Sequence, residues 1–312
     1  MEANLLQEGK YRKAKKKKIE WRELVFYVCL IILPLTQFAI FYIGVNFNVI
    51  LLSFKNYDSV TGTYTWTLSN FSRVWNELTL TSILRDALLN SLLVWFFCVL
   101  VGTTLAVLFS YYIYLKKPFG KTFKFILFIP SVLPSILMVM IYKYFVQEGL
   151  VTYINDIFGT NMLGLLVDSS TRFPTVLFYS VWIGFGSQVL LYTGAMEQIS
   201  PEINDALKVD GAGPLRQLVH IVIPECLPTI STFLISGIAT IFTNQANLWS
   251  FFGSKAEYGD WTIGYYLFRL ANDSNLGISE YPYASALGLC CTVIALPLTF
   301  LANHFLMRRD NA

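Results

Sequence analysis

Hydrophobic residues in this chain gather in long stretches that contain no Asp, Glu, Lys or Arg. Six stretches meet this description: Leu24–Phe54, Ala87–Leu115, Phe125–Tyr142, Pro174–Met196, Cys226–Ser254 and Tyr281–Met307. They hold between 18 and 31 residues, and a helix needs about 20 mostly apolar residues to cross a membrane. The core of a soluble protein does not usually supply six such segments. The pattern therefore predicts an all-α, polytopic membrane protein with six transmembrane helices.

The composition supports a membrane protein and excludes other classes. Hydrophobic residues make up 55% of the 312 residues and charged residues only 14%, whereas soluble globular domains carry about 25% charged residues. A soluble enzyme, a nucleic-acid-binding protein and a disordered chain are excluded on this basis. The five cysteines lie in or at the edges of the apolar stretches. Because they form no CxxC pair, no metal site or disulfide framework is implied.

The basic residues predict the orientation of the chain in the membrane. Sixteen of the 23 Lys and Arg residues lie in the N-terminal tail, after the second and fourth stretches, and at the C-terminus. Basic residues in short loops favour the cytoplasmic side, so we expect both termini in the cytoplasm and contact between the lysine-rich tail and membrane lipid. Four parts are expected: a basic tail (1–23), the first helix and an extracellular loop (24–84), a core of five helices (85–308) and a cytoplasmic end (309–312).

The connection between the fourth and fifth stretches has the pattern of two short helices joined by glycines. Ser200 is a candidate N-cap of the first helix. Gly211 and Gly213 permit a tight turn, and Pro214 can begin the second helix. Such an element, with an apolar face in the cytosol, is suited to docking another protein. A packed loop without a partner is the alternative.

This connection resembles the EAA loop of ABC importer permeases. Residues 202–207 read Glu-Ile-Asn-Asp-Ala-Leu, residues 210–213 read Asp-Gly-Ala-Gly, and residues 221–224 end in a proline. Four further segments match the family outside the loop: Asn70-Phe71, Phe128-Ile129-Pro130, Trp182-Ile183-Gly184 and Pro282–Ala286. Because of these segments together, the chain resembles the carbohydrate permeases of binding-protein-dependent importers, of the maltose and glycerol-phosphate type.

The resemblance implies which residues couple transport to ATP hydrolysis and which partners assemble with the chain. The coupling residues would be Glu202, Asp205, Ala206, Leu207, Asp210, Gly211, Ala212 and Gly213. The partners would be a second homologous permease, two cytoplasmic ATPase subunits that bind ATP and Mg, and an extracellular solute-binding protein. The chain itself contains no G-x-x-x-x-G-K-[ST] phosphate loop, so no cofactor is expected on it. Asp205 and Leu207 depart from the family pattern, which leaves their contacts open.

Uncharged polar residues in the fourth and fifth stretches predict a binding site for the cargo. The candidates are Ser180, Gly184, Gln188 and Tyr192, spaced four residues apart, and the cluster Thr243, Asn244, Asn247 and Trp249. Amides, hydroxyls and aromatic rings together can bind a sugar without any charged group. The resemblance adds that Ser180, Gly184 and Asn244 fall at positions lining the sugar site of maltose-type permeases. Hydrogen bonding between helices is the alternative role for these side chains.

The same charge pattern favours one function over its competitors. The six stretches contain none of the acidic or basic residues that ion-coupled transporters place in their spans, nor a titratable pair for acid–base catalysis. We therefore expect a transport subunit and not an enzyme. The expectation is a permease of a bacterial ATP-driven importer in the cell membrane, carrying a neutral carbohydrate such as an oligosaccharide. The alternatives are an importer of glycerol phosphate or a polyol, and a channel or scaffold protein.

Overall fold

A computed structural model describes residues 21–200, 202–203, 211 and 213–307. The chain forms two compact units, Met1–Leu51 and Leu52–Ala312. The first unit contains most of one apolar helix, Trp21–Ser53, which is long enough to cross a membrane. Its parts are α1 (Trp21–Gln37), the π-helical η1 (Phe38–Gly44) and α2 (Val45–Ser53). The loop after this helix packs within the second unit.

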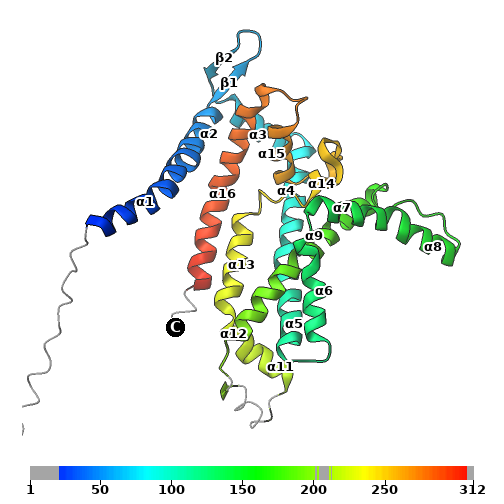
Figure 1. The fold of residues 1–312 in the computed structure, drawn as a ribbon. Helices are drawn as coiled ribbons and strands as arrows, with labels where there is room; N and C mark the ends of the chain where they lie inside the picture. The colour runs from blue at the N-terminus through cyan, green and yellow to red at the C-terminus, as the bar shows by residue number, and fades with distance from the viewer. Residues whose placement is uncertain (1–20, 201, 204–210, 212, 308–312) are drawn as a thin grey trace, which may run out of the picture. The chain divides into compact units, whose positions relative to one another are not determined.

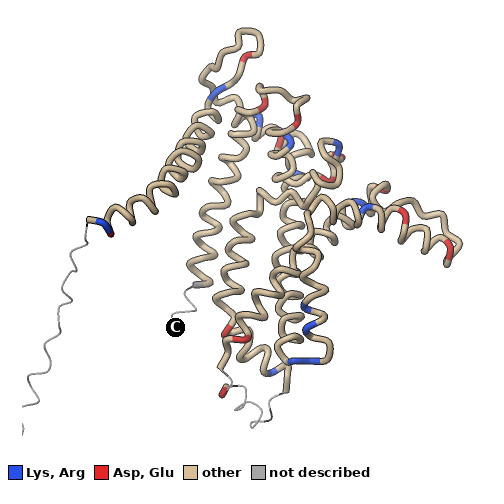
Figure 2. Tube along the Cα trace, in the orientation of Figure 1, with Lys and Arg blue, Asp and Glu red and all other residues tan. Residues whose placement is uncertain are grey.

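The second unit contains three more unbroken helices that are long and apolar enough to cross a membrane. These are Ser82–Tyr114, built from α4 (Ser82–Trp95), η2 (Phe96–Val101) and α5 (Gly102–Tyr114); α9 (Ser169–Met196); and Ile278–Leu306, within η7 (Ile278–Glu280) and α16 (Tyr281–Met307). They correspond to the second, fourth and sixth apolar stretches. Figure 2 shows that the charged residues lie mainly near the helix ends. The predicted all-α membrane architecture is confirmed.

The third and fifth stretches are not single straight helices. The third is a bent pair, in which α6 (Gly120–Val132) turns by 105° into α7 (Ser135–Tyr144), η3 (Phe145–Gly149) and α8 (Leu150–Phe158). The bend falls at Leu133-Pro134, since a proline disfavours helical backbone in the residue before it. The fifth stretch begins at a second bend, of 68°, where α11 (Pro214–Gln217), η4 (Leu218–Val222) and α12 (Ile223–Glu225), which precede the stretch, lead into α13 (Leu227–Ala239).

Short elements cap one end of this bundle, and the apolar pattern did not predict them. They are the antiparallel strands β1 (Lys55–Asp58) and β2 (Thr63–Trp66), α3 (Ser69–Thr79), α14 (Leu248–Phe252), η5 (Gly253–Lys255), η6 (Tyr258–Asp260) and α15 (Ile263–Asn272). Lys55 pairs with Trp66 and Asp58 with Thr63. The amide of Asn70 donates to the carbonyls of Ser53 (3.1 Å) and Lys55 (2.7 Å), which fixes α3 to the base of the hairpin.

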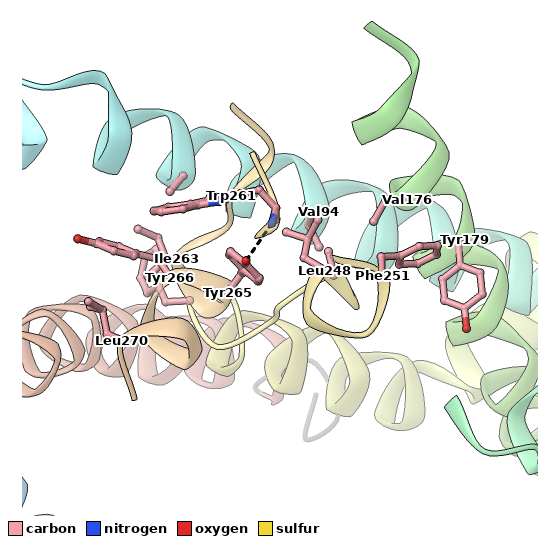
Figure 3. Packing of buried hydrophobic residues seen from close by; sticks show 14 of the residues in the cluster. Val94, Val176, Tyr179, Leu248, Phe251, Trp261, Ile263, Tyr265, Tyr266 and Leu270 are labelled. Carbon is pink, nitrogen blue, oxygen red and sulfur yellow. Dashed lines mark hydrogen bonds between the residues drawn. The ribbon is translucent and has the colours of Figure 1, made fainter. Parts of the chain in front are cut away.

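The buried residues form two hydrophobic clusters, both of which include residues of α9. The first joins α4 and the N-terminal half of α9 to the cap elements and the start of α16. Figure 3 shows Leu248 and Phe251 against Val176 and Tyr179, with the rings of the cap nearby. The second joins α5, the C-terminal half of α9 and η4. Helix α9 is therefore the central packing element, and it connects the capped end of the unit to the opposite end.

Candidate functional site

A polar turn, residues 240–247, links α13 to α14 and contains three of the predicted cargo-binding residues. Ala246 and Asn247 adopt left-handed backbone conformations, with φ of 49° and 58°. The Oδ1 atom of Asn244 accepts a hydrogen bond from the Ala246 N–H at 2.9 Å, which stabilises the reversal. The side chains of Thr243 and Asn244 remain exposed. The predicted fifth helix therefore ends at the polar turn, because these residues satisfy their backbone groups locally.

Two neighbouring helices hold the polar turn in place. Ser180 on α9 donates to the carbonyl of Ala246 at 3.2 Å, and Thr262 before α15 donates to the carbonyl of Asn244 at 2.9 Å. Gly264 on α15 lies so close to the turn that a Cβ atom there would stand 2.6 Å from the carbonyl carbon and oxygen of Thr243. Sequence analysis missed Gly264, since a lone glycine in a helix gives no sign of what approaches it. The turn is thus fixed by contacts from α9 and α15.

The predicted polar stripe on α9 divides into two environments. Ser180 is buried against the polar turn, whereas Gly184 is exposed and has open space beside it. Gln188 is half-buried. Tyr192 is fully buried, and its ring packs against Phe233 of α13 at a centroid distance of 5.3 Å. Because positions four apart drift by about 40° per step around a helix, the stripe turns from the polar turn into the second hydrophobic cluster. Tyr192 therefore offers no exposed surface to a cargo in this conformation.

Asn247 and Trp249 flank the start of α14 and are both half-buried. Asn247 is the residue that precedes the helix. The ring of Trp249 packs on Phe268 at 5.1 Å and on Tyr265 at 6.3 Å. These contacts join α14, which follows the polar turn, to α15. Trp249 therefore helps to hold the polar turn in position.

A row of hydroxyl side chains runs along α13 and into the polar turn, and sequence analysis selected only Thr243 of them. The hydroxyl row consists of Thr229, Thr232, Ser236, Thr240 and Thr243. The three members on α13 are three or four residues apart and therefore share one face; all five are exposed except the half-buried Thr229. At its far end lies a cavity of about 840 Å³ with Gln198, Glu225, Thr229 and Thr232 in its lining. The spacing was readable from the sequence, but it passed unnoticed among apolar neighbours.

Two arginine-centred networks stabilise the capped end. Arg172 at the start of α9 is buried and pairs with Asp260, and with Glu257 at 2.6 Å. Burial raises the pKa of Asp260 above its usual value, and the Arg172 guanidinium opposes that rise. In the second network, Arg73 bonds to Glu77 and Glu280, each at 2.9 Å. The pairs that Arg172 forms, and the pair Arg73–Glu280, join segments far apart in the chain, so the sequence alone did not reveal them.

The predicted coupling loop is described only in part. Glu202 accepts a hydrogen bond from the Ser200 hydroxyl, and Gly211 has a left-handed φ of 65°, as a tight turn requires. Helix α11 begins at Pro214, as predicted, with Gly213 before it. The tyrosine hydroxyl of Tyr111 on α5 donates to the Pro214 carbonyl at 2.7 Å and anchors α11. The remaining predicted coupling residues, Asp205, Ala206, Leu207, Asp210 and Ala212, lie outside the described residues.

Sequence comparison places this fold in a known family. Residues 98–309 match the family described as the inner membrane component of binding-protein-dependent transport systems. The chain belongs to this family. As a binding-protein-dependent permease it is a multi-pass membrane transport component and not an enzyme. In the part of the chain that the structure describes, no three His, Cys, Asp or Glu side chains group as metal ligands would.

Individual relatives and one solved structure resemble the permease over most of its length. The polygalacturonan/rhamnogalacturonan transport system permease YteP of Bacillus subtilis is 24% identical, covering 89% of this chain and 87% of the relative. The diacetylchitobiose uptake permease NgcF of Streptomyces coelicolor is 25% identical, covering 95% and 85%. A crystal structure of a bacterial ABC transporter that imports the acidic polysaccharide alginate matches with a TM-score of 0.75 at 20% identity, over 92% of this chain and 96% of that chain. This structural match shows a shared fold.

Proposed function

We propose that this permease carries a neutral carbohydrate past the polar turn and along the hydroxyl row. The observation that carries the proposal is the combination of an exposed amide and hydroxyl on a rigidly held turn with a row of exposed hydroxyls leading away from it. Exposed polar side chains within a membrane-spanning segment face a water-filled path or another protein. Amide and hydroxyl groups supply both donors and acceptors for sugar hydroxyls. The relatives' names, which include polysaccharide and disaccharide transport, support a carbohydrate cargo.

The charges near this path favour a neutral cargo over an acidic one. The polar turn and the hydroxyl row contain no charged residue. The cavity at the end of the row is lined by Glu225, whose carboxylate would repel an anionic sugar. The acidic alternative is worth testing, because one relative belongs to a polygalacturonan system and the structural neighbour imports the acidic polysaccharide alginate.

A competition assay separates the two cargo classes: neutral oligosaccharides should inhibit uptake of labelled cargo, and oligogalacturonates should not. Inhibition by oligogalacturonates alone would contradict a neutral cargo.

Asn244→Asp tests the polar turn directly. The substitution retains the Oδ1 acceptor for the Ala246 N–H and removes the amide donor offered to the cargo. A lost hydrogen bond in a buried complex costs about 1–3 kcal/mol, so uptake at low cargo concentration should fall roughly tenfold to a hundredfold. Uptake into proteoliposomes is the measurement. Asn76→Asp, on the exposed face of α3, is the matched control. Equal uptake by both variants would remove Asn244 from the cargo path.

The partners proposed for the permease are a second homologous permease, two ATPase subunits and an extracellular solute-binding protein. We also propose that both termini of the permease lie in the cytoplasm. A solved transporter of the same fold is in complex with an alginate pentasaccharide-bound periplasmic protein, which supports a solute-binding protein as partner. ATP and Mg would be bound by the ATPase subunits. The loop around Gly211 would contact those subunits, because its turn precedes a helix that Tyr111 anchors to the membrane core.

Gly211→Pro tests the coupling role of this loop. Proline fixes φ near −65° and cannot adopt the observed φ of +65°, so the turn must rearrange. We expect the ATPase subunits to stop co-purifying and uptake to be lost. Gly211→Asn is the control, since asparagine tolerates the left-handed conformation. If the proline variant retains its ATPase subunits, the loop is not the coupling element.

A further inference from the structure

The bent third span ends in an arm that projects from the side of the bundle. We define the lateral arm as η3, α8 and the returning loop, residues 145–163. Figure 1 shows α6 running with α5 and α9, while α8 extends away from them. The chain bends by 105° between α6 and α7. If α6 crosses the membrane along its normal, a bend of this size turns α7 and α8 toward the membrane plane.

The side chains of α8 divide into an apolar face and a polar face. Thr152 and Asp156 of α8, and Glu148 of the preceding η3, are exposed on the polar side. On the other side, Tyr153 and Ile157 are 67% and 56% exposed, although both are large and apolar. Such a two-sided helix, lying in the membrane plane, has the properties of an interfacial helix.

The tip of the lateral arm is an ordered structure that presents more apolar surface. The Oδ1 atom of Asn155 accepts hydrogen bonds from the Thr160 hydroxyl at 2.8 Å and from the Met162 N–H at 2.9 Å. Its Nδ2 atom donates to the Met162 carbonyl at 3.2 Å. These three bonds fold the loop after α8 back on the helix. The exposed residues of the tip are Phe158, Met162 and Leu163, with Leu163 68% exposed.

The spans next to the arm in the chain also expose apolar side chains. Those on α6 and α7 include Phe125, Ile126, Ile129, Ile136, Met140 and Tyr144. On the arm, Phe145, Tyr153 and Ile157 are exposed as well. The acidic residues Glu148 and Asp156 occupy other positions around the helix, as they would if one side met water and the other met acyl chains.

We propose that the lateral arm seats Tyr153, Ile157 and Phe158 of α8, with Met162 and Leu163 of its tip, in the interfacial region of the lipid bilayer. The occupant of this face is lipid and not a protein. The arm anchors the bend between α6 and α7 at a fixed depth. Because residues 145–163 contain no Lys or Arg, seating does not depend on anionic headgroups. This proposal uses the membrane location of the permease and is independent of its cargo.

Photo-crosslinking in the assembled importer tests the proposal. Benzoylphenylalanine replaces Ile157 in one variant and its neighbour Asp156, on the polar face, in the other. Each complex is reconstituted in phosphatidylcholine vesicles, irradiated and analysed by mass spectrometry of the intact chain. We expect roughly tenfold more phospholipid adduct at position 157 than at 156, because both variants carry the same photoreactive group and only position 157 lies on the face proposed to meet lipid. A variant at Ile126, on the exposed face of α6, shows that the reaction works.

Each result decides the proposal. A phospholipid adduct at position 157, equal in vesicles with and without phosphatidylglycerol, supports it. A covalent product between position 157 and a second permease subunit overturns it, as does equal lipid labelling at 156 and 157. Labelling at 126 without labelling at 157 also overturns it, because position 157 would then be covered or in water.

Discussion

Replacing Gly264 by alanine is expected to abolish most uptake by displacing the polar turn. The new methyl group would lie 2.6 Å from the carbonyl carbon and oxygen of Thr243 and 2.7 Å from the carbonyl carbon of Asn244. These are backbone atoms, so the turn as a whole must move. Overpacking of this kind costs about 1–3 kcal/mol, and misplacing binding groups by an ångström can reduce function roughly a hundredfold. The test is uptake into proteoliposomes, expressed relative to the amount of assembled complex.

Gly259→Ala is the matched control for Gly264→Ala. Gly259 lies in the same capped end, and a Cβ atom there would meet nothing within 4 Å. Its substitution should leave uptake close to that of the unaltered permease. If Gly264→Ala transports as well as Gly259→Ala, the position of the polar turn does not limit transport.

Arg172→Met is expected to produce the largest loss of stability. The side chains of Arg172 and Asp260 are only 8% and 7% exposed. Removing the guanidinium leaves a buried carboxylate without its partner, and breaking a buried pair in this way costs about 3–5 kcal/mol. The free energy of unfolding in a lipid nanodisc, or the thermal midpoint of the purified permease, is the measurement. Arg85→Met is the control, since Arg85 is exposed and pairs with the adjacent Asp86; such surface pairs contribute about 0–1 kcal/mol.

The stability defect of Arg172→Met should depend on pH in a defined direction. Burial raises the pKa of Asp260, and Arg172 is the group that lowers it. Without Arg172 the carboxyl binds a proton more tightly in the folded state than in the unfolded state. Acidification through that raised pKa therefore stabilises the variant relative to neutral pH, and the gap to the unaltered permease narrows. A gap that widens on acidification would contradict the assignment of Asp260 as the unpaired group.

The polar cluster of the fifth stretch was recognisable from the sequence, but its shape was not. A group of Thr, Asn and Gln residues within an apolar stretch is unusual because unpaired polar groups are costly in lipid. The pattern therefore marked residues 240–247 as distinct. It could not indicate that the helix ends there, because termination depends on the left-handed backbone at Ala246 and on bonds from Ser180 and Thr262.

The stripe on α9 shows how far regular spacing alone predicts a shared face. Ser180 and Tyr192 are separated by three steps of four residues, and the helix rotates between them. Ser180 meets the polar turn, whereas Tyr192 packs in the second hydrophobic cluster. Spacing predicts a face only over a short distance, and the neighbour of each position decides what that face contacts. The roles of Gly184, Gln188 and Asn247 in cargo binding remain predictions.

The sequence by itself determined the membrane class, the position of the apolar stretches and the family loop. These features depend on residues close together in the chain. A helix of about 20 residues without charge can cross a membrane, however the rest of the chain folds. The tertiary structure alone decided which segments meet: Arg172 with Asp260, 88 residues away, Ser180 with Ala246, 66 residues away, and Gly264 with the polar turn. It also decided the direction of the lateral arm. Such contacts depend on distances between separate helices, and packing of the whole unit sets those distances.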